Sequence, residues 1–224
     1  MKATPATHPL PVLAQASRCL VLAAFVACGD GPATAPPAAR ELPIIGEREV
    51  GPGGDTLYHV VGDWSFYRQD SALVTEDMLQ GTPYVADFFF TSCPTICPRV
   101  TQQMLRIRER FAAEHPELKL VSFTVDPRRD SVGHLRNYSR NLGVEDADAW
   151  WFLTGEKADL YAIADDYFSV ALESDDAPGG FDHSGRILFV DERGRVRAFA
   201  NGTDEADVDQ LISDIGGYLS AGRG

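Results

Sequence analysis

Residues 84–98 read Tyr-Val-Ala-Asp-Phe-Phe-Phe-Thr-Ser-Cys-Pro-Thr-Ile-Cys-Pro. Residues 84–90 form a mostly apolar run with the length of one β-strand. Strands that read in this way are covered on both faces, as in the middle of a sheet. The stretch therefore predicts a central buried strand, followed by a turn that carries Cys93 and Cys97 into a helix.

Strand and helix patterns alternate around this strand. Apolar residues at Val100, Met104, Ile107 and Phe111 recur at helical spacing directly after the cysteines. The same analysis predicts helices over 98–114, 131–142, 156–168 and 203–219, and strands over 118–125, 149–153, 169–173, 187–191 and 196–200. This order predicts an α/β protein with a thioredoxin-like fold.

Two hairpins are expected to extend that fold. Turn residues between apolar segments predict an N-terminal β-hairpin extension over 64–74 and a late β-hairpin insertion over 187–200. We expect Thr203 to cap the final helix, and either Asp130 or Ser131 to cap the helix over 131–142.

The chain is acidic, with 33 Asp and Glu against 20 Lys and Arg and a formal charge of −13. This balance argues against nucleic acid as a partner, because phosphate backbones attract basic surfaces. It argues equally against electrostatic attachment to anionic lipid. The 4 cysteines are too few for a disulfide-rich scaffold.

Residues 1–27 are typical of a secretory signal peptide. They contain Lys2, Arg18 and no acidic residue, and their apolar run over 19–27 is too short to cross a bilayer. The run ends in Phe-Val-Ala-Cys at Cys28, which resembles a bacterial lipobox with Phe in place of the usual Leu. Cys28 is therefore the predicted lipidation site.

This start of the chain also predicts the domain organisation and the location. Residues 28–41 are rich in Pro, Ala and Gly and predict a flexible tether, and residues 42–224 are the expected folded domain. The expected protein is a membrane-anchored lipoprotein of the bacterial cell envelope, facing the periplasm or the outside. Cleavage without lipidation and an uncleaved anchor are the alternatives, and both also place the domain outside the cytoplasm.

Cys93 and Cys97 fall at the carboxyl end of a strand and the start of a helix, where exposed N–H groups favour thiolates. Their spacing of about one helical turn lets both sulfurs face one side. Two such sulfurs suit a soft metal such as Cu(I). The spacing is one residue longer than in C-x-x-C redox motifs. From spacing alone, a metal site, a redox pair and a structural disulfide all remain open.

Four motifs resemble the SCO/SenC family of copper-binding, thioredoxin-fold cytochrome c oxidase assembly proteins, over roughly residues 60–200. Residues 90–98 (FTSCPTICP) are close to the family pattern F-T-x-C-P-x-x-C-P, and residues 122–130 (SFTVDPRRD) resemble S-V-D-P-x-R-D. Residues 153–155 match L-T-G, and Asp182-His183-Ser184 precedes a strand and an acidic-Gly turn. Each motif is short, but their common order is specific.

The resemblance implies a copper site made of Cys93, Cys97 and His183. His183 is expected at the end of a Gly-containing loop over 175–182, which would make it a mobile third ligand beside a rigid pair. Asp126 and Asp182 are candidates for orienting the ligands, and the alternative for Asp126 is a cap or turn residue. His59, His115 and His134 are expected to be structural or solvated.

The resemblance implies a metallochaperone that delivers copper to the CuA centre of cytochrome c oxidase subunit II. A periplasmic copper donor or a thioredoxin-like reductase would be a further partner. The main alternative is a thiol–disulfide oxidoreductase that keeps the copper-ligand cysteines of the oxidase reduced. A copper or redox sensor that acts through contacts alone is a third class.

Overall fold

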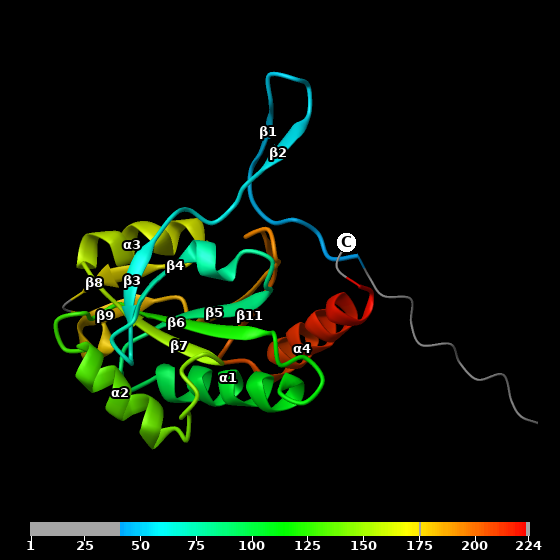
Figure 1. The fold of residues 1–224 in the computed structure, drawn as a ribbon. Coiled ribbons are helices and arrows are strands. Elements are labelled where there is room, and N and C mark those ends of the chain that lie inside the picture. The colour runs from blue at the N-terminus through cyan, green and yellow to red at the C-terminus, as the bar shows by residue number, and fades with distance from the viewer. Residues whose placement is uncertain (1–40, 175, 223–224) are drawn as a thin grey trace, which may run out of the picture. The chain divides into compact units, whose positions relative to one another are not determined.

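The computed structural model describes residues 41–174 and 176–222 (Figure 1). A mixed 7-stranded sheet in the order β11-β10-β5-β6-β7-β3-β4 forms its centre. Its strands are β3 (Ser65–Arg68), β4 (Leu73–Thr75), β5 (Tyr84–Phe89), β6 (Lys119–Thr124), β7 (Trp150–Thr154), β10 (Arg186–Val190) and β11 (Val196–Asn201). The predicted thioredoxin-like α/β architecture is confirmed.

The remaining elements are helices and two small hairpins. The helices are α1 (Cys97–Phe111), α2 (Val132–Asn141), α3 (Lys157–Asp166) and α4 (Glu205–Ser220), with short 3-10 helices η1 (Glu76–Leu79) and η2 (Pro178–Gly180). The hairpins are β1 (Arg48–Val50) with β2 (Thr56–Tyr58), and β8 (Ala171–Glu173) with β9 (Phe181–His183).

β5 is buried along its whole length and pairs in parallel with β6 and antiparallel with β10. Successive side chains of β5 point to opposite faces of the sheet. The ring of Phe88 lies 5.8 Å from that of Tyr167 near α3, whereas Phe89 lies 5.5 Å from Tyr138 of α2. The apolar run therefore fills the space under both helix layers.

The structure changes two predicted helix starts and decides between the two candidates for a third. α1 begins at Cys97, one residue before the predicted start, because Pro98 suits the first turn of a helix. The side chain of Asp204, and not of Thr203, accepts the cap hydrogen bonds of α4. Ser131 caps α2, which leaves the carboxylate of Asp130 available for other contacts.

Two short strand pairs were not predicted. The exposed β1–β2 hairpin has no buried face and therefore no alternating apolar pattern. The predicted loop over 175–182 contains η2 and most of β9, whose pairing with β8 places Ala171 opposite His183. The turn-forming residues over 175–182 predicted only a loop, although this segment forms part of the β8–β9 hairpin.

The first described residues are fixed to the edge of the sheet. The backbone N–H of Ile45 donates to the carbonyl of Val196, 2.9 Å away. The guanidinium of Arg197 donates to the carbonyls of Leu42 and Pro43. No helix among the described residues is both long and apolar enough to cross a membrane. Residues 1–27, Cys28 and nearly all of the predicted tether lie outside the described residues.

Candidate metal centre

Three side chains from different elements meet at the carboxyl end of β5. Cys93 lies in the turn after this strand, Cys97 is the first residue of α1, and His183 ends β9. The Nε2 atom of His183 is 3.9 Å from the Cys93 sulfur and 3.4 Å from the Cys97 sulfur. The three potential ligand atoms all lie within 4.8 Å of one another, and all three residues are buried.

The size of this group suits one metal ion. Metal–sulfur and metal–imidazole bonds of about 2.3 and 2.0 Å place the sulfur and nitrogen atoms of a three- or four-coordinate site about 3.5–3.7 Å apart. The observed separations of 3.4 and 3.9 Å lie on either side of that range. Two thiols and one imidazole form a donor set that selects soft ions such as Cu(I).

The helix start brings the two sulfurs together. The backbone N–H of Cys97 points at the Cys93 sulfur, 3.4 Å away, as expected for an N–H group that has no partner within the first helical turn. Both cysteines are free thiols in the structure, which therefore contains no disulfide bond between Cys93 and Cys97.

The two thiols differ in acidity. Burial is the largest influence on Cys93 and raises its pKa, but hydrogen bonds from the backbone of Cys97 and Thr95 outweigh it, so the pKa lies below its usual value. Burial raises the pKa of Cys97 well above its usual value, and the proximity of Cys93 and Asp87 adds to this rise. Cys93 is therefore the more nucleophilic thiol of the metal-free protein.

Asp130 holds the turn that carries Cys93. Its carboxylate is fully buried and accepts hydrogen bonds from the backbone N–H of Thr91 at 3.1 Å and from the Thr91 hydroxyl at 2.5 Å. The hydroxyl of Thr124, the last residue of β6, donates to the same carboxylate at 2.6 Å. Sequence reasoning considered Asp130 only as a helix cap and missed this function.

Aromatic and glycine residues form the wall around His183. The ring of Phe90 lies 5.5 Å from the imidazole in an edge-on arrangement. Gly179 packs so closely against Phe90 and Pro94 that an added Cβ atom would lie 2.8 and 3.1 Å from their side chains. The β8–β9 hairpin is therefore fitted directly against the cysteine turn.

Asp87 is a buried acid in the middle of β5, with 2% of its surface exposed. It accepts a hydrogen bond from the Ser122 hydroxyl, which in turn accepts one from the indole N–H of Trp150. Burial raises the pKa of Asp87 to about 7, although the Ser122 hydrogen bond opposes the rise. Sequence analysis did not single out this residue, because one acid does not interrupt the apolar pattern of the strand.

The other predicted positions lie outside the group of three. Asp126 is buried just after the end of β6, and one of its carboxylate oxygens is 3.3 Å from the guanidinium of Arg129. The backbone of Asp182 belongs to β9, but its side chain is outside the described part of the structure. Ligand orientation by either aspartate therefore stays a prediction.

The other described histidines are also outside this group. His59 follows β2, and its Nε2 lies 2.9 Å from the carbonyl oxygen of Asp166. His115 lies 3.4 Å from a carboxylate oxygen of Glu117, and His134 is exposed on α2. Their surroundings agree with the expected structural or solvated roles.

Comparison with known proteins points to one family. A family profile described as SCO1/SenC matches residues 53–220. The SCO1 protein homolog of Bacillus subtilis is 30% identical over 162 residues, which cover 72% of this chain and 83% of that protein.

Solved structures agree with this result. A SCO1/SenC family lipoprotein of Bacillus anthracis is 27% identical, with a TM-score of 0.64 over 70% of this chain and 93% of that one. BsSco, a member of the Sco family of cytochrome c oxidase assembly proteins in which a disulfide switch was identified, is 28% identical, with a TM-score of 0.62 over 71% of this chain and 92% of that one. The copper-bound ScoI of Arabidopsis thaliana shares the fold, at 23% identity and a TM-score of 0.61 over 72% of this chain and 99% of that one.

Proposed function

The chain belongs to the SCO1/SenC family, and from that premise we propose that it binds copper through Cys93, Cys97 and His183 and delivers it to the CuA centre of cytochrome c oxidase subunit II. The observation that carries the proposal is the convergence of two sulfurs and one imidazole nitrogen within 4.8 Å. No other group of three or more metal-binding side chains of this kind occurs among the described residues.

The arrangement of the ligands supports binding followed by release. Cys93 and Cys97 are held by the end of β5 and the start of α1, whereas His183 belongs to a hairpin outside the main sheet. The central sheet therefore fixes two ligands, and the third can leave the ion when the hairpin moves. A partner's ligand then takes its place, and copper passes through an intermediate in which both proteins hold it.

The proposed location follows from the start of the chain. Residues 1–27 act as the signal peptide, Cys28 carries the lipid, and residues 28–41 form the tether of the copper-binding domain over 42–224. The related Bacillus anthracis protein is a lipoprotein, which supports this assignment. The domain then works outside the cytoplasm at the membrane, within reach of a membrane-bound oxidase and of a periplasmic copper donor.

The proposal is tested by titrating the purified protein with Cu(I) and Cu(II) under competition from a chelator. We expect one copper per chain, with affinity lost in Cys93→Ser and Cys97→Ser. His183→Ala should lower the Cu(II) affinity and change its absorption spectrum. His134→Ala, at an exposed histidine of α2, is the matched control. Unchanged affinity and spectrum in His183→Ala would remove His183 from the site.

A thiol–disulfide oxidoreductase is the second candidate, because the two free thiols differ in acidity. In that reaction Cys93 attacks a disulfide of the partner, and Cys97 resolves the mixed disulfide. The two thiols give two electrons and two protons to the partner and become a disulfide. Efficient reduction of a subunit II disulfide without stable copper binding would favour this candidate. Thioredoxin-like reductases would then regenerate the dithiol.

Copper delivery and thiol–disulfide exchange also predict different results in a strain that lacks the gene. A deletion strain whose oxidase activity is restored by added copper supports delivery, whereas restoration by a reductant alone supports the redox function. A sensor that acts only through contacts predicts a binding partner other than an oxidase subunit, which a pull-down from the native membrane would identify.

A further inference from the structure

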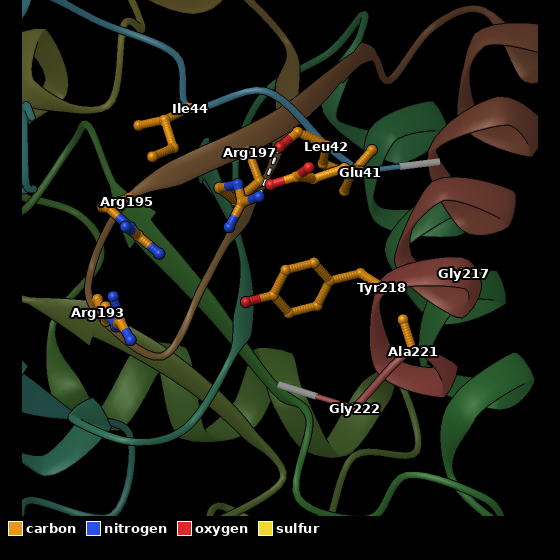
Figure 2. A pocket seen from close by; sticks show the side chains of 10 residues that line it. All are labelled: Glu41, Leu42, Ile44, Arg193, Arg195, Arg197, Gly217, Tyr218, Ala221 and Gly222. Atoms are coloured by element: carbon orange, nitrogen blue, oxygen red, sulfur yellow. Dashed lines mark hydrogen bonds between the residues drawn. The ribbon is translucent and has the colours of Figure 1, made fainter. Parts of the chain in front are cut away.

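A cavity of about 400 Å³ lies between the first described residues, the β10–β11 turn and the end of α4 (Figure 2). Its volume is within the range of sites for small ligands. Three arginines line it, namely Arg193, Arg195 and Arg197. This concentration of positive charge is unexpected in a chain with a formal charge of −13.

The arginines are only partly neutralised. The buried carboxylate of Asp191 accepts hydrogen bonds from Arg195 at 2.8 Å and from Arg197 at 2.9 Å. The exposed residue Glu41 also lines the cavity. Asp191 therefore pairs with two of the three guanidiniums, and Arg193 forms no ion pair among the described residues. The carboxylate of Glu192 is also close to the site, because it accepts a hydrogen bond from the Tyr218 hydroxyl, and it lines a neighbouring cavity together with Arg193.

Two of the arginines keep donors that a ligand can use. The side chain of Arg193 is exposed and has no ion-pair or hydrogen-bond partner among the described residues. Arg195 uses Nε and Nη2 on Asp191, and its Nη1 has no acceptor in the described part of the chain. Arg197 is different, because it is already bonded to Asp191 and to the carbonyls of Leu42 and Pro43.

The rest of the lining is apolar. Leu42, Ile44 and Ala221 contribute side chains, and the ring of Tyr218 extends into the cavity from α4 (Figure 2). The guanidinium of Arg197 lies 5.1 Å from the centre of this ring, which holds both groups in place. A ligand that fits has a negatively charged group with several oxygens and an uncharged organic part.

We propose that this cavity binds a phosphate ester, with the phosphate on Arg193 and Arg195 and the organic part against Tyr218 and Leu42. Phosphate suits the site because its tetrahedral oxygens can meet two guanidinium forks that approach from different residues. A planar carboxylate is satisfied by one fork. This site is separate from the cysteine and histidine residues of the metal centre and does not depend on copper.

The phosphate ester can come from a lipid or from solution. Residues 28–40 separate the proposed lipid attachment at Cys28 from the cavity and reach at most about 45 Å when extended. A bilayer that holds this lipid therefore brings phospholipid headgroups within reach of the cavity. The acidity of the whole chain opposes this approach, so the local arginines must supply the attraction.

Two probes distinguish the sources in the full-length chain. The first is glycerol 3-phosphate, titrated against the melting temperature at constant ionic strength. The second is a set of vesicles of phosphatidylglycerol mixed with phosphatidylcholine, compared with phosphatidylcholine alone. Arg193→Gln removes one guanidinium without breaking any described contact. Arg140→Gln, at an exposed arginine of α2, is the control with the same change in charge.

We expect the wild type and Arg140→Gln to bind alike and Arg193→Gln to bind about tenfold more weakly, which is the effect of one charged hydrogen bond. Binding to both probes supports recognition of the phosphate itself. Binding only to the anionic vesicles supports the proposal with a lipid headgroup as the source. Equal binding by Arg193→Gln and Arg140→Gln, or no binding to either probe, would overturn it.

Discussion

The backbone nitrogen of Thr91 lies 3.1 Å from the carboxylate of Asp130, and this contact links the turn that carries Cys93 to the segment between β6 and α2. The two residues are 39 positions apart in the sequence. The same carboxylate also accepts the hydroxyls of Thr91 and Thr124. The position of one proposed copper ligand therefore depends on a residue that touches no copper.

Asp130→Ala should destabilise the protein and weaken copper binding together. The substitution leaves the buried donors of Thr91 and Thr124 without an acceptor, at a cost of about 3 kcal/mol in the free energy of unfolding. We expect a copper affinity at least about tenfold lower, because the ligand turn loses its fixed geometry. Urea unfolding and copper competition titrations measure the two effects.

Two further variants separate position from stability. Asp130→Asn keeps the shape of the side chain. The amide introduced at position 130 can donate to the Thr91 hydroxyl once that hydroxyl rotates, so copper affinity and spectrum should be close to those of the wild type. Asp204→Ala removes the cap of α4 and should cost about 1 kcal/mol without changing copper affinity. Equal copper affinities in Asp130→Ala and Asp204→Ala would show that Asp130 has no positioning role.

The two thiols should react with iodoacetamide at different rates in the metal-free protein. The pKa of Cys93 is lowered and that of Cys97 is raised, so Cys93 holds more thiolate at any pH near neutrality. Its alkylation rate should rise with pH and level off below the usual thiol pKa, while Cys97 continues to react slowly. Peptide mass spectrometry follows both sites, and faster modification of Cys97 would contradict the assignment.

Asp87 should make the stability of the metal-free protein fall with rising pH. Its folded pKa of about 7 lies above the unfolded value near 3.9, so the folded state keeps a proton that the unfolded state loses between these values. This contribution is fully present below the unfolded pKa and is lost as the pH rises through the folded pKa, by about 4 kcal/mol in total.

Asp87→Asn removes this dependence, because an amide does not ionise. The advantage of the variant over the wild type in free energy of unfolding should be larger at pH 8 than at pH 5, by about 3 kcal/mol. Urea unfolding at the two pH values measures it. Ser122→Ala is a useful comparison, since it removes the hydrogen bond to Asp87 and keeps the carboxyl group. A difference independent of pH would exclude the raised pKa.

Gly179 and Gly180 provide a matched pair beside the metal centre. Both have a positive φ, of +83° and +89°, so alanine at either position should cost about 1–2 kcal/mol of stability. Only Gly179→Ala places a methyl group against Phe90, whose ring contacts His183, and only this variant should weaken copper binding. Equal copper affinities would show that the hairpin does not position His183.

Local sequence patterns predicted most of the fold because burial repeats with the period of each element. The apolar run over 84–90 predicted the fully buried β5, and the spacing from Val100 to Phe111 predicted α1. The same reasoning failed for β1, β2 and β9, which are short and paired only with each other or with β8. β1 and β2 are exposed along their whole length, and β9 has only 3 residues, which is too short for an alternating pattern to be recognised.

The sequence by itself determined the family, the sheet and the pair of cysteines at a helix start, because these depend on residues that are close along the chain. Tertiary structure alone brought His183 to within 3.4 Å of a sulfur 86 positions away. It also turned Asp130 from an expected cap toward Thr91, and gathered Arg193 and Arg195 against Leu42 at the other end of the domain. These contacts arise when distant segments pack around the common core, where buried polar groups must find partners that no local pattern specifies.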